Sequence, residues 1–352
     1  MVLKQKQQWF LVVLLVVAIA SCSNNPVSSL KQSSQASSTA TNCRSIDHQM
    51  GITEVCGRPE KIVVLGSSLL EVLLALGMQP VGFADRIPFH QGNYDNPREQ
   101  IPYLGSQITG QPANLGLDYN PSIEAILKTQ PDLIVGTEAN RSQYQTLSKI
   151  APTLLFKRFD SETSLRAIAK ATEQTGRAEQ LLAQVDRQIA ASRAALNSVV
   201  ATQPKVLMLV SSSAQDFHLI SHTNSFCGSL VRNLGFQLVY PPDLSETDLE
   251  RPSLLSLEAL PQLNDADSIV LLAYDWDNFQ GMDQFENNQL QMLKRSWKKN
   301  AIAQSLAASK VGRVYFMPAY LCLGLPGPIG TELYLNELEE QLLSSQSFVV
   351  KE

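Results

Sequence analysis

"KIVVLGSSLLEVLLALGMQPVGFAD" covers residues 61–85 and alternates short and long apolar runs. After Lys61, the residues from Ile62 to Leu65 are all β-branched or aliphatic, which is typical of a strand buried on both faces. The stretch that follows predicts a helix closed by Gly77, and "PVGFAD" predicts the next strand. Two strands separated by a helix normally pair in parallel, so this stretch predicts an α/β fold.

A helix–turn–strand unit of similar sequence occurs in both halves of the chain. The first copy, "PSIEAILKTQPDLIVG", covers residues 121–136, and the looser second copy, "LSLEALPQLNDADSIVLL", covers residues 255–272. Glu124 and Glu258 occupy the same place in the two copies. With a length of 352 residues, this repetition predicts two lobes of similar build.

The two halves are separated by a strongly helical stretch, in which a break is expected at Gly176. Beyond the break, the apolar residues fall on one helical face; they are Leu182, Val185, Ile189 and Leu196. This helix is expected to run from Arg177 to about Val200. At 1.5 Å per residue it forms a rod of roughly 36 Å, which predicts a stiff connection between the two halves.

The predicted organisation therefore has three folded parts. They are an N-terminal α/β lobe at residues 58–159, a linking helix at residues 160–201 and a C-terminal α/β lobe at residues 202–352. Both lobes are expected to be Rossmann-like, with a cleft between them of the kind that binds small molecules.

The first 21 residues have the pattern of an export signal. Lys4 and Lys6 precede an apolar run over residues 9–20, which is shorter than the ~20 residues that a membrane-spanning helix needs. The run ends in "IASC", which resembles the bacterial lipobox, in which the chain is cut before the cysteine and lipid is attached to it. We expect Cys22 to be lipidated; an ordinary secretory cut or an uncleaved anchor is the alternative.

Residues 22–57 form the segment before the first lobe. The polar stretch that follows Cys22 cannot bury enough apolar surface to fold, so this stretch is expected to be a flexible tether. Export permits disulfides. Cys43 and Cys56 flank a short segment before the first strand, which favours a disulfide between them. Cys227 and Cys322 remain, either as a second disulfide or as free thiols.

Several functions lack support. The chain has 33 acidic and 28 basic residues, so it has no basic field for nucleic acid or an anionic membrane. It contains no phosphate-binding loop, no dinucleotide fingerprint and no serine-hydrolase elbow. Its four histidines have no ligand spacing that favours a metal site, so we expect no resident metal and no cofactor; they are His48, His90, His218 and His222.

Four stretches, taken together in their order and spacing, resemble the helical-backbone (class III) substrate-binding proteins of bacterial ABC importers. They are residues 59–85, 121–136, 144–156 and 297–317. The similarity covers about residues 58–343 and is strongest to the ferric-dicitrate and siderophore binders.

This resemblance implies a non-enzymatic protein that captures a ferric siderophore or ferric citrate and delivers it to the transmembrane subunits of an ABC permease. It also implies a lipid-anchored location at the periplasmic side of the inner membrane. Cobalamin, haem or another metal chelate is the alternative cargo. A two-lobed enzyme that processes a chelate is a weaker alternative, because the sequence shows no concentrated set of acid–base residues.

In the resembling family, one glutamate on each lobe docks into arginine pockets of the permease. Glu124 and Glu258 stand at these positions. The alternative is that both are ordinary first-turn acids, which the helix dipole favours.

Bulky anionic chelates need arginines for bidentate contacts and aromatic walls. Five candidates stand on predicted strand-end loops: Arg86, Tyr94, Arg141, Trp276 and Tyr320. Each is alternatively a solvated or packed residue. Asp118 stands where hydroxamate binders of the family carry an arginine, which makes a hydroxamate cargo less favoured. Glu71 interrupts an apolar run three residues after Ser68, and this spacing predicts a capping box.

Overall fold

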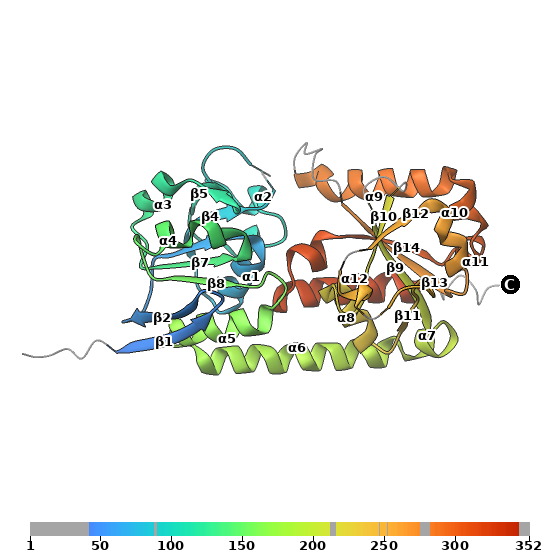
Figure 1. Ribbon diagram of the computed structural model, residues 1–352, viewed down its shortest axis with the longest axis horizontal. Helices are drawn as coiled ribbons and strands as arrows, with labels where there is room; N and C mark the ends of the chain where they lie inside the picture. Colours follow the sequence, from blue (N-terminus) through green and yellow to red (C-terminus); the bar gives the residue numbers. More distant parts are fainter. Residues whose placement is uncertain are drawn as a thin grey trace, which may run out of the picture. The chain divides into compact units, whose positions relative to one another are not determined.

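A computed structural model describes residues 42–87, 90–211, 216–245, 247–251, 253–274 and 282–344 (Figure 1). The side chains of Asp216 and of residues 282–289 lie outside this description, as do the predicted signal segment and Cys22. The described residues belong to one compact unit, which runs from Thr41 to Glu352. No helix within the described ranges is long and apolar enough to cross a membrane.

The first lobe is built on a six-stranded sheet of order β6-β5-β4-β3-β7-β8 (Figure 1). All its pairings are parallel except that of β5 with β6. The strands are β3 (Ile62–Leu65), β4 (Pro80–Asp85), β5 (Ala113–Leu117), β6 (Asn120–Pro121), β7 (Leu133–Thr137) and β8 (Thr153–Phe156). The α/β fold predicted from the opening stretch is confirmed.

Helices cover both faces of this sheet, which is why its central strands are apolar throughout. Ile62 and Val64 pack with α1 (Ser67–Ala75) and α5 (Ser161–Ala171). Val63 and Leu65 point to the other face and pack with α3 (Ile123–Thr129) and α4 (Tyr144–Leu147). The short helices of the loops are α2 (Pro97–Gln100), η1 (Gly105–Gln107) and η2 (Glu138–Gln143).

The second lobe has a sheet of order β12-β10-β9-β13-β14, with β11 paired to β9. β9, β13 and β14 are parallel, whereas β10 and β12 are antiparallel to their neighbours. The strands are β9 (Lys205–Ser211), β10 (Asp216–Leu219), β11 (Gln237–Leu238), β12 (Ser253–Ser256), β13 (Ser268–Ala273) and β14 (Val314–Pro318). The helices are α8 (Phe226–Asn233), η3 (Asp248–Glu250), η4 (Leu257–Leu263), α9 (Met282–Lys299), α10 (Ala301–Ser305), α11 (Ala307–Lys310), the π-helical turn η5 (Tyr320–Gly324) and α12 (Pro328–Ser344).

The lobes are connected by α5, α6 (Thr175–Ala195) and α7 (Asn197–Thr202). The break lies at residues 172–174 rather than at Gly176, which is inside α6, because Glu173 takes a left-handed φ of 61° and ends α5. With 21 residues, α6 is roughly 32 Å long at 1.5 Å per residue.

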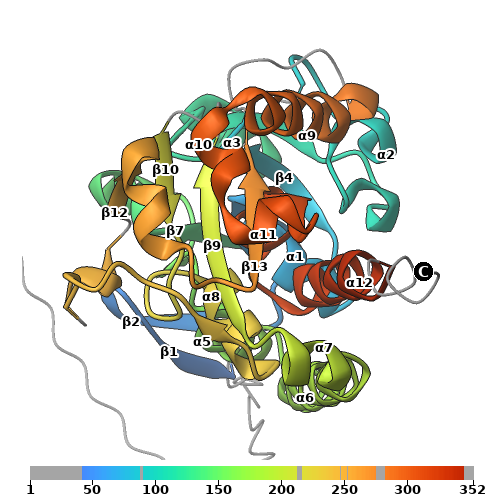
Figure 2. The same ribbon diagram turned by 90° about the vertical axis from the view of Figure 1, so that its right-hand side faces the viewer.

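A second connection, which the sequence did not indicate, is made by α12. It packs along α6 and against α1 (Figure 2). Ile329 and Leu333 contact the apolar core of the first lobe, whereas Leu335 and Leu338 belong to the core of the second. Two helices therefore bridge the lobes.

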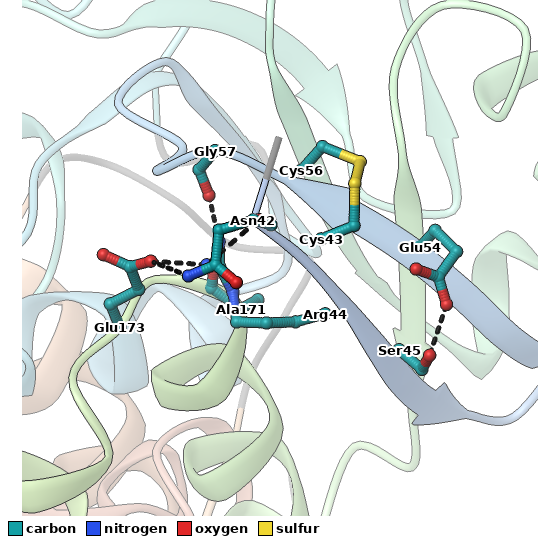
Figure 3. The surroundings of a disulfide bond; sticks show 9 residues. All are labelled: Asn42, Cys43, Arg44, Ser45, Glu54, Cys56, Gly57, Ala171 and Glu173. Atoms are coloured by element: carbon teal, nitrogen blue, oxygen red, sulfur yellow. Dashed lines mark hydrogen bonds and ion pairs between the residues drawn. A yellow bond between two sulfur atoms is a disulfide. The ribbon is translucent and has the colours of Figure 1, made fainter. Parts of the chain in front are cut away.

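Two disulfides are present in the described part of the chain. Cys43–Cys56 closes the hairpin of β1 (Cys43–His48) and β2 (Gly51–Cys56), as the sequence favoured (Figure 3). Arg44 in this hairpin donates to the carbonyls of Gly57 and Ala171 and pairs with Glu173, so the hairpin is held against the end of α5 (Figure 3). Cys227–Cys322 links α8 to η5, which resolves the open choice in favour of a bond.

The capping box predicted for Ser68 and Glu71 is wrong. α1 follows Gly66 without a side-chain cap. Glu71 is fully buried and instead accepts hydrogen bonds from the N–H groups of Gly327 and Gly330. All nine residues of α1 are buried, so the Glu71 side chain contacts another segment of the chain and does not face solvent at the start of the helix.

Candidate functional site

Polar side chains gather where the parallel strands of the first lobe end. Asp85 is the last residue of β4, Asp118 directly follows β5, and Arg158 lies two residues beyond β8. The carboxyl ends of parallel strands lie at one edge of a sheet, where α/β proteins commonly bind ligands. These three residues are close enough for both carboxyls to act on the pKa of the Arg158 guanidinium.

Asp118 and Asp85 both interact with Arg86. Asp118 is 2% exposed and accepts from Nε of Arg86 at 3.4 Å, while the Arg86 side chain is 41% exposed. The Asp85 carboxylate accepts from the backbone N–H of Arg86 at 2.7 Å. Burial raises the pKa of Asp85 to about 7; the bond from the Arg86 N–H opposes this shift, and the charge of Asp118 adds to it.

Arg158 is half-buried, and burial is the main reason that its pKa is lowered, followed by the charge of Arg86. Its guanidinium lies 5.6 Å from the centre of the Phe159 ring. Within the described ranges the guanidinium makes no hydrogen bond or ion pair, whereas the backbone N–H of Arg158 donates to the Glu138 carboxylate at 2.8 Å. A partly desolvated guanidinium with open donors is suited to bind an anionic group of a ligand.

The second lobe contributes Tyr320 at the start of η5. It is 2% exposed and stacks on Tyr103 at 5.7 Å between ring centres. Burial raises its pKa well above the usual value, and Asp85 adds to that shift while Arg158 opposes it. Residues of both lobes thus meet, and we call Asp85, Arg86, Asp118, Arg158 and Tyr320 the strand-end cluster.

Tyr94 lies near this cluster in the first lobe. Its side chain is buried between the rings of Phe83 and His90, at 5.8 and 6.1 Å. Burial raises its pKa above the usual value, and Asp85 adds to the shift. Tyr94 also lines a cavity of about 430 Å³ together with Asn114.

Comparison with known proteins settles the family. A family model described as "periplasmic binding protein" matches residues 62–321. The chain belongs to this periplasmic binding protein family. It is 26% identical over 349 residues to the probable siderophore-binding lipoprotein YfiY of Bacillus subtilis, covering 96% of this chain and 98% of the relative. It is 30% identical over 313 residues to the Fe(3+)-citrate-binding protein YfmC of the same organism, covering 86% and 84%.

Solved structures show the same fold. Staphylococcus aureus SirA complexed with staphyloferrin B superposes with a TM-score of 0.69 at 24% identity, covering 85% of this chain and 98% of SirA. Bacillus subtilis FeuA complexed with ferri-bacillibactin has a TM-score of 0.65 at 21% identity, with coverages of 86% and 98%. The family resemblance read from the four sequence stretches is confirmed.

The five residues predicted to bind the ligand of this periplasmic binding protein lie in different environments. Arg86 and Tyr320 belong to the strand-end cluster, and Tyr94 packs beside it. Arg141 lies in η2 after β7; it is exposed, and its side chain makes no hydrogen bond or ion pair with the described residues. Trp276 lies outside the described residues.

Asp85 and Arg158, which also belong to the strand-end cluster, were not among the candidates predicted from the sequence. A signal for both was in the sequence, since Asp85 ends the predicted strand "PVGFAD" and Arg158 closely follows the strand "TLLF". The register that brings these strand ends together is set by pairing across the sheet, which residue types alone do not give.

The two glutamates proposed for docking occupy matched places. Glu124 is the second residue of α3, which precedes β7, and Glu258 is the second residue of η4, which precedes β13. Both are exposed. Glu124 has a side chain 79% exposed and pairs with Lys128 at 2.8 Å, which lowers the pKa of its carboxyl.

Among the described residues, no group of three or more His, Cys, Asp or Glu side chains could hold a metal ion. Three of the histidines have ordinary partners, and His90 Nε2 lies 3.0 Å from the Asn93 carbonyl oxygen. His48 Nε2 lies 2.8 Å from the Thr53 hydroxyl, and His222 Nδ1 lies 3.0 Å from the Tyr240 hydroxyl.

Proposed function

We propose that this protein is the substrate-binding component of an ABC importer, which captures a ferric chelate at the strand-end cluster and delivers it to the permease. The observation that carries the proposal is Arg158, a half-buried guanidinium with open donors at the carboxyl edge of the first sheet. The names of the two relatives from Bacillus subtilis support a ferric siderophore or ferric citrate as the cargo.

The cluster has the chemistry for this cargo. Carboxylate and catecholate oxygens of a ferric chelate accept bidentate bonds from guanidinium groups, and such charge-assisted bonds are stronger than neutral ones. Arg158 and Arg86 would donate them. Asp118, which accepts from Nε of Arg86, would set the orientation of that side chain, and Tyr320 would form the wall from the second lobe.

Delivery would use the exposed glutamates Glu124 and Glu258, one on each lobe, as docking charges for two permease subunits. Such exposed charges act mainly on orientation and association rate. Lipid on Cys22 would anchor the protein at the periplasmic side of the inner membrane, and the similarity to the lipoprotein YfiY supports such an anchor.

The test is a fluorescence titration of the purified full chain with ferric citrate, ferric staphyloferrin B and ferri-bacillibactin. Saturable binding of at least one chelate is expected. Replacing Arg158 by Ala should raise Kd about 10- to 100-fold, because a hydrogen bond to a charged group contributes about 1.5–3 kcal/mol. Arg187→Ala, an exposed change on α6, is the matched control and should leave Kd unchanged.

Failure to bind any ferric chelate, together with saturable binding of cobalamin or haem, would overturn the ferric cargo. Equal Kd values for Arg158→Ala and Arg187→Ala would remove the strand-end cluster as the binding site.

A further inference from the structure

Helix α1 of the first lobe makes a buried polar contact with the second lobe. Oε1 of Glu71 accepts from the Gly327 N–H at 2.5 Å, and Oε2 accepts from the Gly330 N–H at 3.0 Å. One turn earlier, Ser67 Oγ donates to the Gly324 carbonyl at 3.1 Å. These three bonds join residues more than 250 positions apart and lie between α1 and the segment that runs from η5 into α12.

The segment contains glycines where it approaches most closely. A Cβ at Gly327 would lie 2.8 Å from Cδ of Glu71, and a Cβ at Gly324 would lie 2.9 Å from the ring of Tyr320. A side chain at Gly327 would push the segment away from Glu71, and one at Gly324 would displace the Tyr320 ring. The glycines of "GLPGPIG" are therefore required for the contact.

A carboxylate is well suited to this position. α12 begins at Pro328, and the first N–H groups of a helix lack acceptors within the helix. The positive end of the helix dipole also favours a negative group there. Burial nevertheless raises the pKa of the Glu71 carboxyl to about 8, against the effect of the two N–H bonds. Both carboxyl oxygens still accept from backbone N–H groups, so the side chain fixes the position of the segment as well as filling space.

The contact bears on the proposed site because of what precedes it. The held segment starts at Gly324, the last residue of η5, and the first residue of η5 is Tyr320. Tyr320 is the contribution of the second lobe to the strand-end cluster. We propose that Glu71 is a positioning residue for cargo binding, which holds Tyr320 and its lobe at the distance from Asp85 and Arg158 that the cargo requires. This inference rests on the proposed function, in which cargo binds at that cluster.

The test uses the full chain, purified from its host membrane in detergent, with the variant Glu71→Gln. Gln has the same size, but its NH₂ group cannot accept a hydrogen bond, so only one of the N–H groups of Gly327 and Gly330 keeps its acceptor. Kd is measured for whichever of ferric citrate, ferric staphyloferrin B and ferri-bacillibactin the unmodified protein binds. We expect Kd to rise about tenfold or more. Glu162→Gln, an exposed change on α5, is the matched control and should bind as the unmodified protein does.

A second readout reports the position of the lobes directly. Spin labels are placed at Gln145→Cys in the first lobe and Val311→Cys in the second, both exposed positions. The distance distribution between them should broaden or shift in Glu71→Gln and stay unchanged in Glu162→Gln. A residue that only stabilised the fold would lower stability without changing this distribution in the folded protein.

Gly327→Ala disturbs the same contact from the other side and serves if Glu71→Gln does not fold. It should give the same two effects, and the double variant should cost less than the two single changes together, because both remove one interaction. Unchanged Kd, or an unchanged distance distribution in a variant that binds more weakly, would overturn the positioning role. If the unmodified protein binds no chelate, the proposed function fails and the positioning claim fails with it.

Discussion

The carboxyl group of Asp85 lies buried at the end of β4, with Asp118, Arg86 and Arg158 around it. Two carboxyls and two guanidinium groups balance each other when all are ionised. An anionic cargo placed against Arg158 would bring a negative charge towards Asp85 and raise its pKa further. The charge of Asp85, which lies beside the pair of Arg86 and Asp118, thus depends on both cargo and pH.

The raised pKa of Asp85 predicts a pH dependence of stability. The pKa is about 7 in the folded protein and about 3.9 in an unfolded chain, so the folded state holds this proton more tightly. The contribution of Asp85 to the free energy of unfolding is therefore greatest below pH ~4. It falls by at most about 1.4 kcal/mol per pH unit as the pH rises towards 7 and stays low above that.

The measurement is urea unfolding between pH 4.5 and 7.5. Asp85→Asn should show a flatter pH dependence than the unmodified protein. Asp186→Asn, an exposed change in α6, should leave the slope unchanged. Identical slopes for Asp85→Asn and the unmodified protein would contradict the prediction.

At the scale of elements, η5 is held from three directions. Cys322 is bonded to Cys227 in α8, Tyr320 stacks on Tyr103, and Gly324 accepts from Ser67 in α1. A short π-helical turn has little stability of its own. Its geometry, and with it the position of Tyr320, is therefore set by these contacts.

Removing the buried disulfide should weaken both stability and binding. Cys227→Ala combined with Cys322→Ala should lower the free energy of unfolding by about 2–5 kcal/mol, because a long closed loop constrains the unfolded chain. Kd for the ferric chelate should rise as well, since η5 loses one of its restraints. Urea unfolding and fluorescence titration measure the two effects.

The matched comparison is Cys43→Ser combined with Cys56→Ser. This pair opens a disulfide in the β1–β2 hairpin, far in sequence from η5, so it should lower stability and leave Kd unchanged. Equal effects of the two double variants on Kd would show that the disulfide at η5 has no specific effect on binding.

At the scale of the molecule, two lobes of related build are joined by α6 and bridged by α12. Each lobe presents one exposed glutamate in the same helix–turn–strand unit. A two-lobed protein that meets two permease subunits would use one such charge on each lobe, and both must stay exposed to do so.

Reversing the charges of Glu124 and Glu258 should impair delivery of the chelate to the permease without affecting its binding. In cells that depend on this importer, Glu124→Arg combined with Glu258→Arg should reduce uptake of ⁵⁵Fe-labelled chelate about tenfold or more, because each exposed charge would then repel its partner. Kd of the purified variant should not change. Glu340→Arg, an exposed change on α12, should leave uptake intact. Normal uptake by the double variant, or weakened binding, would argue against docking.

Local patterns were sufficient for the α/β class, the repeated helix–turn–strand unit and the Cys43–Cys56 disulfide. Each depends on residues close together in the sequence, whose periodicity and spacing report burial directly. The sequence also predicted Arg86 and Tyr320 as ligand candidates, because residues at the ends of parallel strands face a shared edge, and their role in binding stays a prediction. Asp85 and Arg158 were not singled out, although they stand at the same kind of position.

The role of Glu71 could be known only from the folded chain. Its spacing from Ser68 matches a local helix cap. Its carboxyl oxygens, however, accept hydrogen bonds from the N–H groups of Gly327 and Gly330, more than 250 residues away. The bridging by α12 and the meeting of Tyr320 with the first lobe are of the same kind. Contacts between distant segments depend on how whole lobes pack, and no short-range pattern of apolar and polar residues encodes them.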